Sequence, residues 1–204
     1  MRDRKATGGM AGRATALFAL GLLASACALV KSQEAPRETY DLTAPDRVPG
    51  AGATSAQILV KVPTALKAID SDRIVVRPQP TVITYLEGAQ WQDSVPRLFQ
   101  SKLLQTFENT GNTGATALPG DGLVIDHQLV IDIRRFGIVA EGAPRALLEV
   151  SVKLLADRTG QVRETRIFTA EAPAGPPPEG YVAAIDAAFD AMATDIVRWV
   201  LRLV

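Results

Sequence analysis

The chain has 204 residues with 22 basic and 22 acidic side chains, so its formal net charge at neutral pH is zero. Charges of both signs are interspersed, and no basic stripe is present that could neutralise successive phosphates, which excludes a typical nucleic-acid-binding protein. The single cysteine excludes a disulfide framework, so a folded domain must depend on its hydrophobic core.

The N-terminus has the three parts of a secretory signal. A basic start precedes an apolar run at 17–23 and three small residues at 24–26, and Cys27 follows. This order is typical of a bacterial lipoprotein signal, which is cleaved before a cysteine that then carries a diacylglyceryl group. We therefore expect residues 1–26 to be a signal peptide and Cys27 to be the lipid attachment site. Each buried CH₂ of the acyl chains would add about 0.8 kcal/mol of membrane affinity.

Three other interpretations of this segment stay open. A transmembrane anchor would need roughly twenty apolar residues, and this run has about ten. Ordinary secretion after Ala26 is an alternative because Ala24 stands where a lipoprotein signal usually has leucine. A buried and inert thiol is the third, since most free cysteines are of that kind.

Cleavage would change both the charge and the location of the protein. Removing residues 1–26 takes away four basic residues and one acidic residue, so 18 (22 less 4) and 21 (22 less 1) remain, a net charge of −3. Inner-membrane retention resembles a rule that places an aspartate directly after the lipidated cysteine. Here Ala28 and Leu29 follow Cys27 instead. We therefore expect a lipid-anchored protein at the periplasmic face of the outer membrane.

Residues 27–56 are rich in proline and glycine and have too little apolar surface to offset the entropy of ordering. The sequence therefore predicts a flexible tether at 27–56 and one domain at 57–204. Tyr40, Leu42 and Pro45 are a local exception, a short extended piece that would dock either on the domain or on a partner.

The domain begins with two short β-rich segments at 57–62 and 73–77. A helix is expected between Asp93, a suitable cap, and Gly111, a suitable end. Its apolar residues recur at three- and four-residue spacing and form one face. These residues are Val95, Leu98, Phe99, Leu103 and Phe107.

Apolar residues alternate with polar ones at 123–136 and again at 148–154, which predicts two half-buried strands. A turn at 157–160 leads to a third strand at 162–169, completing an antiparallel meander. The chain finishes in a long helix at 181–201. The expected order is β-β-α-β-β-β-α, an α+β fold with a single mixed, mostly antiparallel sheet and two helices on one face.

Several segments together carry a family resemblance. They are Tyr40–Pro45, Ile58–Val60, Leu66 to Arg77, Tyr85, Trp91, Leu129–Phe136, Arg166–Phe168 and Ala183–Trp199. In order and spacing they resemble the PqiC-like family of ABC-type transport auxiliary lipoproteins, outer-membrane partners of MCE lipid-transport systems. The family's strand usually has an acidic residue directly after its aromatic, whereas here Gly137 follows Phe136.

The resemblance implies a tethered periplasmic domain that serves a transporter of phospholipid or another apolar molecule. It implies an MCE-domain protein and an ABC permease and ATPase as partners, with the lipoprotein acting alone or as a homo-oligomer. A structural or assembly lipoprotein that binds an outer-membrane protein, with no transported cargo, is the alternative.

No catalytic constellation is evident in the sequence. His127, the one histidine, falls on the apolar side of its strand with Leu129, which favours a partly buried, hydrogen-bonded histidine over a general base. Asp126 and Asp132 lie on the polar face of the same strand, where charges are expected. Nucleophile, phosphate-loop and metal-ligand motifs are missing. We expect no enzyme, no cofactor and no metal site.

The remaining candidates are partner contacts. Trp199 and Leu201 belong to a C-terminal run with little polar cover, and Tyr40 and Leu42 form the extended piece of the tether. The alternative for Trp199, and also for Trp91, is burial between sheet and helix, which is the usual place for such rings.

Overall fold

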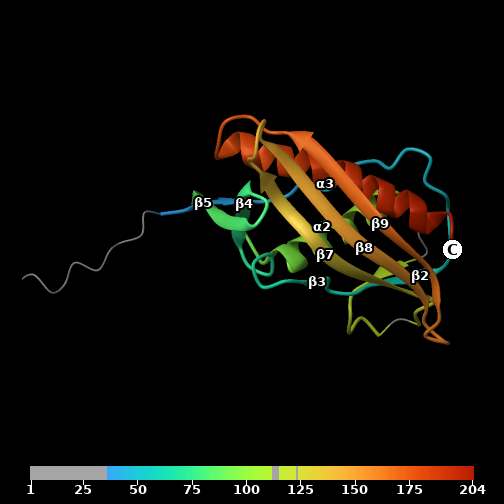
Figure 1. The fold of residues 1–204 in the computed structure, drawn as a ribbon. Helices are drawn as coiled ribbons and strands as arrows, with labels where there is room; N and C mark the ends of the chain where they lie inside the picture. The colour runs from blue at the N-terminus through green and yellow to red at the C-terminus, as the bar shows by residue number, and fades with distance from the viewer. Residues whose placement is uncertain (1–35, 112–114, 123) are drawn as a thin grey trace, which may run out of the picture. The chain divides into compact units, whose positions relative to one another are not determined.

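The computed structural model describes residues 36–111, 115–122 and 124–204 (Figure 1). Residues 37–204 form one compact unit. The expected signal peptide at 1–26 and the expected lipidation site, Cys27, lie outside the described residues. The described strands are β1 (Glu38–Tyr40), β2 (Gln57–Val60), β3 (Thr64–Ala65), β4 (Arg73–Gln79), β5 (Val82–Trp91), β6 (Ala115–Ala117), β7 (His127–Val139), β8 (Arg145–Ala156) and β9 (Val162–Pro173); the described helices are α2 (Val95–Asn109) and α3 (Glu179–Leu201).

One mixed sheet contains all nine described strands. β7, β8 and β9 form an antiparallel meander, while β2, β3 and β4 each pair in parallel with a different stretch of β7. The hairpin of β4 and β5 extends the sheet to β1, and β6 pairs with β2. β7 is therefore the strand that joins the two parts of the sheet.

The expected α+β class, the mixed sheet, the meander and the two helices are confirmed. Figure 1 shows α2 and α3 on the same side of the sheet, with α3 packed along β8 and β9. Phe99 of α2 meets Phe189 of α3 edge to face, with ring centroids 5.3 Å apart, and meets Phe136 of β7 at 6.4 Å. Both helices and the sheet thus share one aromatic core.

The N-cap residue of the first described helix lies one position after Asp93, the expected cap. Ser94 is the N-cap residue, and the Asp93 carboxylate accepts the N–H of Ser94 at 2.6 Å. Pro96 lies in the first turn, where its missing N–H costs nothing. The helix ends at Asn109, and Gly111 follows in the left-handed conformation with φ of +62°, as expected from its place after the last apolar residue.

The N-terminal boundary of the domain differs from the expectation. The tether was expected to run to residue 56, but the compact unit starts at Arg37. β1 pairs in parallel with β5, and Leu42 is only 1% exposed. The backbone N–H and hydroxyl of Thr43 donate to the two carboxylate oxygens of Asp186, at 2.7 and 2.8 Å. The Tyr40–Pro45 segment therefore packs on its own domain. The proline- and glycine-rich composition of 27–56 had instead predicted a flexible tether.

Candidate functional site

Three of the four residues expected to contact a partner are buried in the core of this chain. Leu42 is 1% exposed, and Trp199 and Leu201 are each 3% exposed. The Trp199 ring packs edge to face on Phe168, with centroids 5.5 Å apart, and its indole N–H donates to Glu164 Oε1 at 3.1 Å. In this structure these side chains have no free surface for a partner, so the core interpretation of Trp199 holds. Trp91 is buried as well.

Tyr40 is the one expected contact that reaches the surface. Its ring packs against the core, and its hydroxyl donates to Glu38 Oε2 at 2.6 Å. The hydrogen bond to the Glu38 carboxylate is the main cause that raises the pKa of Tyr40 to about 12; slight desolvation and the charges of Glu38 and Glu179 add to it. Tyr40 stays a candidate for contact with a partner.

The polar residues in β7 and directly before it have structural partners. The Asp126 carboxylate accepts the N–H of Gln57 at 2.9 Å, and Asp132 accepts the hydroxyl of Thr64 at 3.2 Å. His127 is half-buried, with Nε2 3.4 Å from a guanidinium nitrogen of Arg163, and its buried Nδ1 has no hydrogen-bond partner. The expected partial burial is present, while the expected hydrogen bonding is limited to this one long contact.

Neither a metal site nor a membrane span is found in the described part of the chain. Within residues 36–111, 115–122 and 124–204, no three histidine, cysteine or carboxylate side chains are grouped so that they could hold an ion. None of the helices in those ranges has the length and hydropathy required to cross a bilayer.

A basic hollow lies instead on the face of the sheet that the helices leave open, and it depends on an irregularity in β7. The pairing of β7 with β8 shifts register between Ile133 and Arg135, so Arg134 is an extra residue in β7. Strict alternation would send one of two consecutive arginines into the core. The bulge leaves Arg134 and Arg135 both exposed, while Ile133 and Phe136 on either side are buried.

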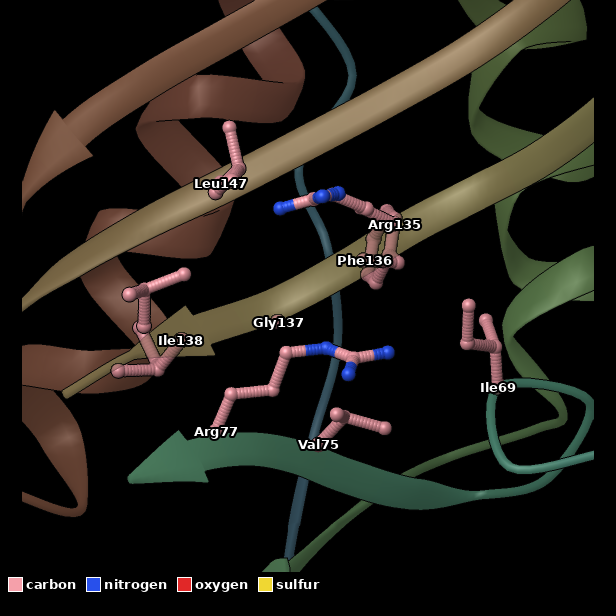
Figure 2. A pocket seen from close by; sticks show the side chains of 9 residues that line it. Ile69, Val75, Arg77, Arg135, Phe136, Gly137, Ile138 and Leu147 are labelled. Atoms are coloured by element: carbon pink, nitrogen blue, oxygen red, sulfur yellow. The ribbon is translucent and has the colours of Figure 1, made fainter. Parts of the chain in front are cut away.

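Gly137 brings β4 close to β7 at the hollow. Its φ is +157°, and a Cβ at this position would lie 2.3 Å from the carbonyl oxygen of Val75. The acid that the related family usually has directly after its aromatic would therefore collide with the β4 backbone. Figure 2 shows Arg77 of β4 and Arg135 of β7 on opposite sides of this glycine.

The hollow, which we name the arginine hollow, has a volume of about 380 Å³. Its lining residues are Arg77, Gln79, Pro80, Arg134, Arg135, Val139, Glu141, Arg145 and Leu147. A narrow crevice with mostly apolar walls adjoins it and shares Arg77, Arg135, Val139 and Leu147. The site thus combines guanidinium groups with apolar side chains.

The four arginines of the hollow differ in their partners. Arg134 lies 3.7 Å from Asp132 and 3.6 Å from Glu149, and Arg145 forms a 3.0 Å ion pair with Glu171. By contrast, the guanidinium groups of Arg77 and Arg135 have neither a hydrogen bond nor an ion pair to any described residue. These two cations are available to a ligand. The sequence analysis missed the site, although two adjacent arginines and a glycine in an alternating strand are signals of a bulge.

The comparison with known families decides which family this is. Residues 40–197 match the family described as "ABC-type transport auxiliary lipoprotein component". The chain belongs to this family. The match includes every described strand from β2 to β9, all of α2 and most of α3.

The chain is also similar to individual proteins. An uncharacterised protein from Bradyrhizobium diazoefficiens is 34% identical over 175 residues, which cover 83% of this chain and 46% of that relative. The chain thus spans about half the length of the curated relative. The crystal structure of protein XCC0632 from Xanthomonas campestris is 31% identical, with a TM-score of 0.74 over 81% of this chain and 95% of that one.

More distant structures share the fold alone. A hypothetical protein from Chlamydia trachomatis, CT253, is 8% identical with a TM-score of 0.51, covering 72% of this chain and 96% of that one. The family is one of transport auxiliary lipoproteins rather than of enzymes.

Proposed function

We propose that this lipoprotein is the membrane-anchored auxiliary component of an ABC transporter of the MCE type, which moves lipids or other apolar molecules across the envelope. The observation that carries the proposal is the match of residues 40–197 to the auxiliary lipoprotein family. The match identifies the kind of system, while the cargo, the MCE-domain protein and the ABC permease and ATPase are part of the proposal.

The anchor in this proposal is an acylated Cys27 at the periplasmic face of the outer membrane. Cys27 follows an apolar run and three small residues, as a lipoprotein signal requires. Ten peptide units join Cys27 to Arg37, where the compact unit begins, and at most roughly 3.6 Å per residue gives a reach of about 36 Å. The domain would therefore stay close to the membrane surface and act there.

An accessory role suits the chemistry of the domain. The carboxylates of Asp126, just before β7, and of Asp132 in β7 are engaged in structural hydrogen bonds, and among the described residues the polar neighbour of His127 is Arg163, which is not a nucleophile. What the domain offers is a surface: the Tyr40 hydroxyl and the arginine hollow. Binding and positioning are tasks that such a domain can perform without catalysis.

The anchor is tested by labelling cells with radioactive palmitate. The wild-type protein should take up label and fractionate with the outer membrane, whereas Cys27→Ala should do neither. A wild-type protein without label, released as a free periplasmic domain, would overturn the anchored arrangement.

The transporter assignment is tested by crosslinking in cells, with a photoreactive residue at Tyr40. We expect crosslinks to an MCE-domain protein or to an ABC permease. In a separate experiment, we expect the His127→Ala variant to restore transport in a deletion strain as well as the wild-type protein does. Crosslinks solely to an outer-membrane protein outside any transport system would favour a structural or assembly lipoprotein instead.

A further inference from the structure

The arginine hollow has features of an anion-binding site that the family assignment does not explain. Guanidinium groups bind phosphate oxygens in a planar, charge-assisted geometry, and an arginine without an ion-pair partner is free to do so. Arg77 and Arg135 meet this condition from two different strands, on opposite sides of Gly137 (Figure 2). Glu141 is the one carboxylate in the lining, so the lining is positively charged overall.

The apolar surroundings limit the kind of anion. Val139, Leu147 and Pro80 line the hollow together with the arginines, and Ile69 and Val75 line the crevice below. A free inorganic phosphate would leave this apolar surface uncovered. A phosphate that carries a glycerol backbone and the first carbons of acyl chains would cover it, and about 380 Å³ lies within the usual size range of small-molecule sites.

The hollow lies at the tip of the β4–β5 hairpin, and β5 is also the strand with which β1 pairs. β1 pairs in parallel with the last three residues of β5, Ala89 to Trp91, and so lies at the other end of β5 from Val82. Val82 pairs with Gln79 at the tip of the β4–β5 hairpin, and Gln79 lines the hollow. The reach of about 36 Å joins the proposed anchor to Arg37, so the domain that carries the hollow would stay near the headgroups of that membrane.

We infer that the arginine hollow binds the phosphate of a glycerophospholipid headgroup, with Arg77 and Arg135 as the two ligands and Val139 and Leu147 against the glycerol and acyl ends. This inference rests on the proposed function and assigns a binding site for a lipid cargo to this domain. Arg134 and Arg145 also line the hollow, but each has a carboxylate partner.

The test uses the full-length, lipidated protein in phosphate-free maltoside micelles, titrated calorimetrically with dihexanoyl phosphatidylglycerol below its own micelle concentration and, separately, with inorganic phosphate. Replacing both guanidinium groups in R77Q/R135Q should weaken binding of the short-chain lipid by roughly tenfold or more. The matched control, R97Q/R158Q, removes the same charge from two exposed arginines outside the hollow and should bind as wild type does.

Each outcome decides the matter. Equal binding by R77Q/R135Q and R97Q/R158Q overturns the inference, because general attraction to the protein then explains the signal. Inorganic phosphate that binds as tightly as the lipid also overturns it and assigns the hollow to a free anion. If R77Q/R135Q does not fold, the single exposed substitution Arg135→Glu replaces it, with the same expected loss. If the wild-type protein binds no lipid and cells with R77Q/R135Q transport normally, lipid binding at the arginine hollow is refuted and the transporter assignment stands. Failure of the crosslinks would refute the transporter assignment separately.

Discussion

Replacing Trp199 distinguishes a core residue from a partner contact, because the two roles predict opposite behaviour of the isolated protein. The side chain is 3% exposed, packs on Phe168 at 5.5 Å and donates to Glu164 at 3.1 Å. Trp199→Ala removes an indole from a closed site and should lower the free energy of unfolding by about 3–5 kcal/mol. That is a large fraction of the roughly 5–15 kcal/mol typical of a whole domain.

A milder substitution separates packing from the hydrogen bond. Trp199→Phe keeps a ring against Phe168 but loses the indole N–H to Glu164, so it should cost about 1–2 kcal/mol. Urea unfolding followed by far-ultraviolet circular dichroism measures both variants without depending on the fluorescence of the residue replaced. The slope of the unfolding free energy against urea concentration should stay the same, since unfolding exposes about the same surface area in each variant as in the wild type.

The control is Leu66→Ala, because Leu66 is 75% exposed and its loss should change the free energy of unfolding by no more than about 0.5 kcal/mol. The reasoning fails if Trp199→Ala is as stable as Leu66→Ala. If that stable variant had also lost crosslinking to a partner, Trp199 would be a contact residue after all.

Three further predictions concern the N-terminal segment and the bulged strand. Leu42→Ala should lower the free energy of unfolding by about 2–4 kcal/mol in urea titration, whereas a true tether residue would show no change. Gly137→Ala should cost about 2–4 kcal/mol because its Cβ meets Val75, while Gly142→Ala, with positive φ but open space, should cost about 1 kcal/mol; equal melting points would contradict the proposed clash. Absorbance of tyrosinate should show Tyr40 titrating near pH 12, so its contribution to stability is complete below about pH 10 and is lost as the pH rises toward 12. Glu38→Ala should return that pKa to its ordinary range, and an unchanged titration would refute the hydrogen bond as its cause.

Local patterns were sufficient for the central elements. Apolar side chains recur with a period of two at 148–154 and with helical spacing at 95–107. The structure buries the apolar face that each pattern predicts. β5 was missed because its first residues are exposed on both faces and show no alternation. β1, β3 and β6 are too short for any pattern, and each is a strand only because a longer strand supplies its hydrogen bonds.

The sequence alone determined the lone cysteine and the amphipathic elements, and it predicts the secretion signal, since these properties depend on residues that are close together in the chain. Tertiary structure decided that Leu42, Trp199 and Leu201 are core, because their burial depends on elements far away in sequence. It also decided that Arg77 and Arg135 face one hollow. Their strands are brought together by parallel pairing, a bulge and a glycine that allows the two backbones to approach closely. The spacing of residues in the sequence does not predict such a contact.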